Sequence, residues 1–336
     1  MKISRVLFGT LLGLTTAAAS ITAHAQGITL RFGHVVQPGH PISLGTQKLG
    51  EILAAKSNGR IKVQELGGGS VGGEAQQLSA VQGGIQDMTM PSATVMGGVI
   101  KEFTLLDIPF SFSSAEQVDA LLQGPLGQML LSKLDEKGMV GLDFWETGFR
   151  NFTNSRKPIV NVEDLKGLKL RVIPNPMFME SFAALGANPV PMAFPELYGA
   201  LESKAMDAQE NPFSIVLTSK FFEVQKFLSV TNHVYTANPV VISKKSWDKL
   251  APADQKLVKE AVQEAGAFQR KLSRDASAGA RKELETKMQV NDVPPATLAK
   301  MRELTKPVAE KFAGTYDPSV VKVYRAELEK VHATVR

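Results

Sequence analysis

The chain has 336 residues, a formal net charge of +5 and no cysteine. This length predicts two domains or one large domain, and the weak positive charge excludes the electrostatic footprint of a nucleic-acid-binding protein. Because no disulfide can form, the hydrophobic core must supply the stability, and a chain of this size can bury enough apolar surface to do so.

The first 25 residues have the parts of a signal peptide. Lys2 and Arg5 form the positive end, residues 6–20 are apolar or small, and the triplet that ends at Ala25 fits the small-x-small cleavage rule. A membrane anchor is the alternative, but the apolar run is too short for one. We therefore expect cleavage after Ala25 and export to the periplasm, which leaves a soluble chain of net charge +3 once the two basic residues are removed.

Strands and helices alternate in the first part of the chain. Apolar alternation predicts strands over 30–35, 60–66 and 87–90, and helical spacing predicts helices over 43–55 and 74–81. A glycine-rich turn joins the second strand to the second helix. This order is typical of an α/β lobe with a mainly parallel sheet.

Residues 168–212 show a second strand–helix–strand arrangement. A strand over 168–173 precedes a helix closed by Gly186, a further helix over 194–201 and a strand that ends at Pro212. Two α/β lobes would accommodate both arrangements.

Arg171 lies in the middle of this strand, between Leu170 and Val172. A guanidinium in such a position does not reach open water easily and needs an anion. A core carboxylate of the same chain would satisfy it, and so would the carboxylate of a ligand. The spacing alone leaves both interpretations open.

Two further patterns support a two-lobed organisation. The segments 80–87 and 200–207 share a helix end, a turn and an aspartate that opens a strand, as expected for two lobes of one design. The segments 139–155 and 230–243 are predicted to cross between the lobes in extended conformation. Two such strands form a hinge, because few φ/ψ angles need to change when a cleft closes.

The C-terminal part is predicted to be helical. Pro252 fits the first turn of a helix, and apolar residues at helical spacing follow from Leu257 to Leu272, in a helix that reaches Met288 if it is unbroken. At 1.5 Å per residue this helix is roughly 55 Å long, which is enough to brace both lobes. The tail from Pro294 also has helical character, with breaks expected at Pro307 and Pro318.

The motifs between Lys169 and Pro212 resemble those of the DctP-type solute-binding proteins of TRAP (tripartite ATP-independent periplasmic) transporters. The chain has K-L-R-V-I at 169–173, A-L-G-A-N-P-V-P-M at 184–192 and D-A-Q-E-N-P at 207–212, with a helix before the last motif. The resemblance runs from about residue 30 to the C-terminus.

This resemblance implies an α/β, two-lobed periplasmic-binding-protein fold of the type II-like class. Two hinge-crossing strands would join the lobes, and the long helix would brace both. The expected boundaries are 26–148 plus 237–276 for lobe I and 149–236 plus 277–336 for lobe II, with the long helix over 252–288.

The resemblance also implies a binding site. Arg171 would be the carboxylate clamp, because a planar guanidinium meets a carboxylate with two parallel hydrogen bonds. Arg150 and Asn211 would complete the contacts to the carboxylate, Phe194 would pack on the ligand, and Glu74 would bind its hydroxyl groups. Each of these four residues has a structural alternative. Arg150 could be a surface arginine, Asn211 a turn cap and Phe194 a core aromatic residue. Glu74 could be a first-turn glutamate favoured by the helix dipole.

Other polar or aromatic side chains lie at predicted strand ends and crossings, where the cleft is expected. As further ligand-binding candidates we take His40, Asn151, Trp145, Asn175 and Tyr235. Each of them has a structural role as its alternative.

Enzyme motifs are weak in this sequence. The glycine run 67–72 satisfies both G-x-S-x-G, with Ser70, and G-x-G-x-x-G, which shows how little either pattern means here. His233 and His332 are the histidines downstream of Ser70, and neither has a characteristic motif. No His, Asp or Glu cluster has metal-ligand spacing. We expect neither catalysis nor a cofactor or metal.

The sequence therefore predicts an exported, monomeric receptor for a small organic acid.

 The acid would be a uronate or aldonate, or a C4-dicarboxylate, with a weak preference for acids that carry hydroxyl groups. The resemblance implies that the closed receptor would deliver its ligand to a TRAP permease with a large and a small membrane subunit, and we expect no binding of nucleic acid. An exported serine hydrolase using Ser70 and a ligand-sensing subunit of a signalling system are the alternatives.

Overall fold

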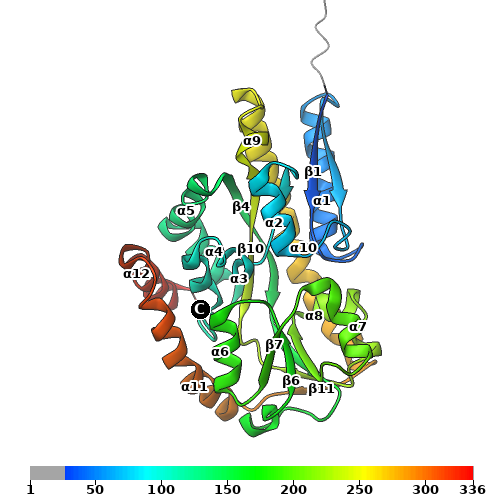
Figure 1. The fold of residues 1–336 in the computed structure, drawn as a ribbon, viewed down its shortest axis with the longest axis vertical. Coiled ribbons are helices and arrows are strands. Elements are labelled where there is room, and N and C mark those ends of the chain that lie inside the picture. The colour runs from blue at the N-terminus through cyan, green and yellow to red at the C-terminus, as the bar shows by residue number, and fades with distance from the viewer. Residues whose placement is uncertain (1–26, 336) are drawn as a thin grey trace, which may run out of the picture.

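Two mixed β-sheets form the centres of two lobes within residues 27–335, which the computed structural model describes (Figure 1). The predicted signal peptide lies outside the described residues. The first lobe contains β1 (Ile28–Gly33), α1 (Pro41–Lys56), β2 (Ile61–Leu66), α2 (Glu74–Gly83), β3 (Met88–Thr89), α3 (Ala93–Met96), η1 (Lys101–Asp107), α4 (Ala115–Gln123), α5 (Pro125–Ser132), η2 (Asp135–Lys137), β4 (Met139–Phe149), β10 (Tyr235–Ser243) and α9 (Lys244–Trp247).

The second lobe follows the first crossing of the chain. It contains β5 (Asn151–Asn154), η3 (Val162–Leu165), β6 (Lys169–Val172), α6 (Pro176–Ala184), β7 (Asn188–Pro191), η4 (Phe194–Glu196), α7 (Leu197–Glu202), β8 (Ala208–Asn211), α8 (Phe213–Thr218), η5 (Phe221–Glu223), β9 (Phe227–Val230) and β11 (Gln289–Asp292). The two-lobed α/β fold predicted from the sequence is confirmed.

The two sheets are built alike. In the first sheet β2, β1 and β3 are parallel and β10 is antiparallel to β3, while in the second β7, β6 and β8 are parallel and β5 is antiparallel to β8. Asp87 and Asp207 have matching roles, since each accepts a backbone N–H at 2.9 Å, from Arg31 in β1 and from Lys169 in β6. The sequence similarity around these aspartates therefore reflects two lobes of one design.

The chain crosses between the lobes at two adjacent places. The first crossing runs from β4 to β5 through Arg150, and the second runs from β9 to β10. Backbone hydrogen bonds join the two crossings, with Arg150 N donating to Val234 O at 2.8 Å and His233 N donating to Arg150 O at 3.2 Å. Both predicted crossing segments are thus extended and lie side by side.

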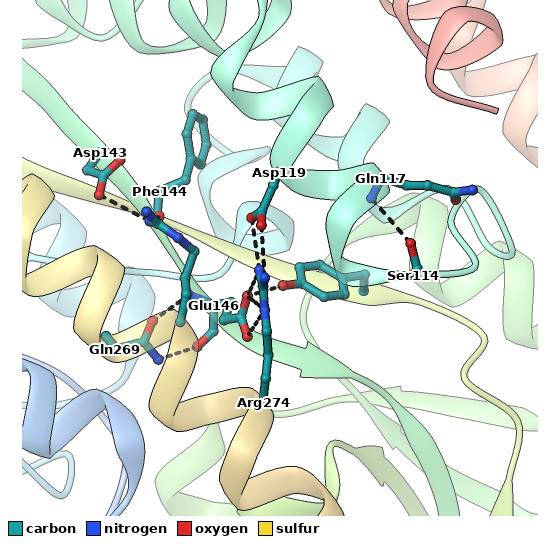
Figure 2. A network of polar contacts seen from close by, with 10 residues as sticks. Ser114, Gln117, Asp119, Asp143, Phe144, Glu146, Gln269 and Arg274 are labelled. Carbon is teal, nitrogen blue, oxygen red and sulfur yellow. Dashed lines mark hydrogen bonds and ion pairs between the residues drawn. The ribbon is translucent and has the colours of Figure 1, made fainter. Parts of the chain in front are cut away.

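The long helix α10 (Pro252–Glu285) packs against α1 and β4 of the first lobe and against α8 of the second. Its polar contacts with the first lobe are shown in Figure 2. Arg274 donates to both carboxylate oxygens of Asp119 at 2.8 Å and to Glu146 at 2.8 Å. The side-chain amide of Gln269 accepts a hydrogen bond from Glu146 N–H and donates one to Glu146 C=O. These contacts fix the helix against β4.

The last two helices differ from the sequence prediction. Pro307 lies inside α11 (Pro295–Ala313) and does not end it, because one missing N–H costs a long, packed helix a single hydrogen bond. The helix α12 (Pro318–Thr334) packs against α4 and α5 of the first lobe (Figure 1). The assignment of the whole of 277–336 to the second lobe was therefore wrong: α12 buries its apolar face in the first lobe's core.

No helix in the described part of the chain is both long enough and apolar enough to span a membrane.

Candidate ligand-binding site

A cavity of about 210 Å³ lies between the two lobes. Its volume is below the roughly 300–1,000 Å³ typical of drug-sized ligand pockets, so it suits a small metabolite. The first lobe and the crossing strands supply His34, Val35, Val36, Ile42, Glu74, Ala75, Met90, Ser92, Val95, Gly98, Thr147, Arg150, Thr236 and Asn238. The second lobe supplies Arg171, Ile173, Pro174, Ala193, Phe194, Asn211 and Ile215. We call this space the inter-lobe cavity.

Arg171 is a buried cation at this cavity. Its side chain comes from β6, and its Nε and Nη2 atoms donate to the Met192 carbonyl at 2.9 and 2.7 Å. No carboxylate within residues 27–335 forms an ion pair with it, and its guanidinium lies 5.9 Å from the centre of the Phe194 ring. Burial, reinforced by the charge of Arg150, lowers the pKa of Arg171 to about 10, so the group stays charged at neutral pH.

Arg150 also lines the cavity, but its charge is neutralised by the chain. Its Nε and Nη2 atoms donate to the two carboxylate oxygens of Glu210, and Nη1 donates to Thr236 at 3.1 Å. Glu210 is fully buried and is also bonded to His233 at 3.2 Å. Although burial opposes it, the charge of Arg150 and the contact with His233 lower the pKa of Glu210. Arg150 thus lines the cavity as predicted, but Glu210 already balances its charge.

Three more predicted site residues line the cavity. Asn211 is buried at the end of β8 and donates to Gln209 at 2.5 Å. Phe194 opens η4 and is partly exposed to the cavity. Glu74 is the first residue of α2, and its Oε2 atom accepts hydrogen bonds from Ser92 N at 3.1 Å and Ser92 Oγ at 2.7 Å. Burial raises the pKa of Glu74.

His40 and Asn175 do not line the cavity, which corrects their assignment. Each is the N-cap of a helix that begins with the proline directly after it. His40 Nδ1 accepts from Ile42 N at 3.2 Å, and Asn175 Oδ1 accepts from Met177 N at 2.9 Å. Asn175 also donates to Thr94 O at 3.0 Å. Their polar atoms complete the backbone hydrogen bonding of the helix ends.

Asn151, Trp145 and Tyr235 are likewise outside the cavity lining. Asn151 Oδ1 accepts two backbone N–H groups of the second crossing at 2.9 Å. Trp145 donates to Val262 O of α10 at 3.3 Å, and Tyr235 donates to the Glu146 carboxylate. These side chains hold the hinge and the long helix together, so their assignment to the ligand is corrected as well.

Two residues at the site were not among the predicted ones: Glu210, which lies behind Arg150, and His34, which lines the cavity. Glu210 lies inside the quoted motif D-A-Q-E-N-P, yet its pairing with Arg150 depends on the register of β5 and β8, which places Phe152 opposite Glu210. His34 follows β1; its Nε2 atom contacts Glu65 at 2.9 Å, and its buried Nδ1 atom has no hydrogen-bond partner within residues 27–335.

Ser70 lies exposed in the glycine turn. Within the described residues no hydrogen bond joins its side chain to a histidine, and no group of three His, Cys, Asp or Glu side chains could hold a metal ion.

Comparison with known proteins decides the family. Residues 32–315 match the family model described as bacterial extracellular solute-binding protein, family 7 (DctP). The chain belongs to this family. The solved structure of the sugar acid binding protein DctPAm from Advenella mimigardefordensis, in complex with galactonate, is similar with a TM-score of 0.89 and 36% identity, covering 91% of this chain and 99% of that one.

Curated DctP-family relatives agree with this assignment. The chain is 38% identical over 272 residues to the 2,3-diketo-L-gulonate-binding periplasmic protein YiaO of Escherichia coli, covering 81% of this chain and 82% of YiaO. It is 36% identical over 255 residues to the C4-dicarboxylate-binding periplasmic protein DctP of Rhodobacter capsulatus, covering 75% and 76% of the two chains. The DctP family is a family of solute-binding receptors and not of enzymes, which argues against the Ser70 hydrolase.

Proposed function

We propose that this chain is a periplasmic receptor that holds a small organic acid in the inter-lobe cavity, with the carboxylate of the ligand on Arg171. The observation that carries the proposal is the buried, charged guanidinium of Arg171 at the cavity. Its hydrogen-bond partner is a carbonyl and not a carboxylate. An arginine has five N–H donors, and the two bonds to Met192 leave three of them. A buried charge without a counter-ion costs free energy. An anion that enters the cavity is therefore stabilised most when it binds at the Arg171 guanidinium.

The Met192 carbonyl also sets the orientation of the ligand. It occupies the Nε/Nη2 edge of the Arg171 guanidinium. The end of the fork formed by Nη1 and Nη2 then remains for two parallel hydrogen bonds to a carboxylate. The second amide hydrogen of Asn211 can add a contact to the same group. Arg150 supports this site by holding Glu210 in place and does not clamp the ligand itself.

Ligand binding would close the lobes. Arg171 and Phe194 belong to the second lobe, whereas His34 and Glu74 belong to the first, so a ligand that touches both sides favours the closed state over the open one. The crossings at Arg150 and between β9 and β10 provide the hinge.

The ligand class follows from the relatives. YiaO is named for 2,3-diketo-L-gulonate, DctPAm was solved with galactonate, and the Rhodobacter protein is named for C4-dicarboxylates. We infer that this chain takes a sugar acid or a dicarboxylate, reaches the periplasm by cleavage after Ala25 and delivers its ligand as a monomer to the large and small membrane subunits of a TRAP permease.

The test is a thermal-shift screen against organic acids, followed by calorimetric titration of the best ligand. Arg171→Ala should weaken binding at least a hundredfold, which is about 2.7 kcal/mol, because the ligand carboxylate loses its buried partner. Arg171→Lys should also fail, since an ammonium group lacks the planar fork. Arg325→Ala, which removes an exposed arginine on α12, is the matched control. An affinity of Arg171→Ala within a few-fold of wild type would refute the clamp.

A further inference from the structure

The wall of the inter-lobe cavity carries negative as well as positive charge. Arg171, Arg150 and Glu74 line it, and Glu210 lies directly behind Arg150. Two cations and two carboxylates therefore belong to the site. Because Arg150 and Glu210 neutralise each other, the charges left to act on a ligand are those of Arg171 and Glu74.

Glu74 is placed to act on the ligand. Its Oε2 atom takes both hydrogen bonds from Ser92, and its Oε1 atom has no hydrogen-bond partner within residues 27–335. The glutamate enters the cavity from the first lobe, whereas Arg171 enters from β6 of the second. A ligand whose carboxylate sits on Arg171 and which spans the cavity therefore meets Glu74 with its remaining groups.

Apart from His34, the other polar side chains of the lining carry hydroxyl or amide groups. Thr147 Oγ1 donates to Asn238 Oδ1 at 2.7 Å, and Ser92 and Thr236 add hydroxyl groups. The Nδ1 atom of His34 is buried without a partner in the described chain. Hydroxyl groups of a ligand suit such a surface, because each can both donate and accept a hydrogen bond, and a free carboxylate oxygen of Glu74 accepts from a hydroxyl directly.

We propose that the cavity selects acids with a single carboxylate and several hydroxyl groups, and that Glu74 is the residue that rejects a second carboxylate. This inference rests on the proposed function, because it places the first carboxylate on Arg171. A second carboxylate would find no unneutralised arginine in the lining and would lie near the carboxylate of Glu74. Two carboxylates that share a desolvated site repel each other strongly.

Glu74→Gln tests the role of the charge with little change of shape. The amide oxygen of glutamine can keep the contacts with Ser92, while its amide nitrogen can donate to a carboxylate. Calorimetric titrations would use matched pairs of acids that differ in one carboxylate: galactonate with galactarate, and erythronate with meso-tartrate. The wild-type protein, Glu74→Gln and Arg171→Ala would each be titrated. Glu264→Gln, which removes an exposed carboxylate on α10, controls for net charge.

We expect the wild type to bind the better monocarboxylate at least a hundredfold more tightly than its dicarboxylate partner. Glu74→Gln should reduce this ratio at least tenfold, and Glu264→Gln should leave it unchanged. Equal or tighter binding of the dicarboxylate, still lost in Arg171→Ala, would overturn the inference and leave the arginine clamp intact. An unchanged ratio in Glu74→Gln would overturn the role of Glu74. Binding of either acid that Arg171→Ala does not weaken, or no binding of any acid, would overturn the proposed function itself.

Discussion

Arg171, which is buried, and Arg274, which is partly buried, are both held by hydrogen bonds, yet their surroundings differ. Arg274 contacts two carboxylates, those of Asp119 and Glu146 (Figure 2). The hydrogen bond with Asp119 and that with Glu146 both raise the pKa of Arg274. Arg171 contacts one carbonyl, and burial lowers its pKa. An arginine whose charge the chain already balances fixes the fold, whereas one whose charge is left unbalanced at a cavity is suited to bind an anion.

Arg150 shows that position alone does not make a binding arginine. It lines the same cavity as Arg171, but Glu210 satisfies it as completely as Asp119 and Glu146 satisfy Arg274. The partner of a guanidinium, more than its place in a pocket, decides whether it can take a ligand.

The largest effect is expected for Glu210→Gln, which would leave the buried Arg150 without a counter-ion. We expect a loss of about 3–5 kcal/mol in the free energy of unfolding, because one member of a buried ion pair is removed. Urea denaturation at pH 7 measures it, with the exposed Glu223→Gln as control. A loss below about 1 kcal/mol would mean that Arg150 does not depend on Glu210, and the contrast with Arg171 would disappear.

Arg274→Ala should cost about 2–3 kcal/mol of stability and change ligand affinity less than threefold. The cost is smaller than for Glu210→Gln because the side chains of Arg274 and Asp119 are about a third exposed, at 30% and 29%, so water can replace part of the contact. Denaturation and calorimetric titration of the same preparation measure both quantities. A large loss of ligand affinity at unchanged stability would mean that Arg274, like Arg171, acts on the ligand and not on the fold.

His40 extends the comparison to a buried group that can become neutral by losing a proton. Burial, reinforced by the charge of His34, lowers the pKa of His40 to about 3, whereas an unfolded histidine binds a proton near pH 6.5. The unfolded state therefore binds more protons below pH 6.5, and stability falls as the pH falls from that value toward 3.

Between pH 7 and 5.5 this histidine should cost about 1 kcal/mol of stability. His40→Asn keeps an acceptor for the helix cap and should remove that part of the pH dependence, as measured by urea denaturation at a series of pH values. Burial also lowers the pKa of His233, so a residual slope is expected. An unchanged slope in His40→Asn would contradict the assignment.

Much of the fold was accessible from local patterns. Strand alternation, the aspartates at 87 and 207 and the periodicity of α10 each depend on neighbours along the chain, and the structure agrees with them. The place of α12 was not accessible, because an amphipathic pattern shows that a helix buries one face but not which lobe receives it.

The site was predictable in part for the same reason. The structure places Arg171 at the cavity, as the family resemblance implied, whereas its position inside an apolar strand had left a core carboxylate open as its partner. The pairing of Arg150 with Glu210 required the register of two strands about 60 residues apart in the chain. His40 and Asn175 did carry a local signal: each directly precedes a proline that begins a helix, which is typical of a cap and not of a ligand contact.

A crystal structure with a bound sugar acid such as galactonate would test the central claim most directly. We predict carboxylate oxygens about 2.7–2.9 Å from Nη1 and Nη2 of Arg171, with the Arg150–Glu210 pair intact. A carboxylate bound to Arg150 with Glu210 displaced, or bound away from Arg171, would contradict the account.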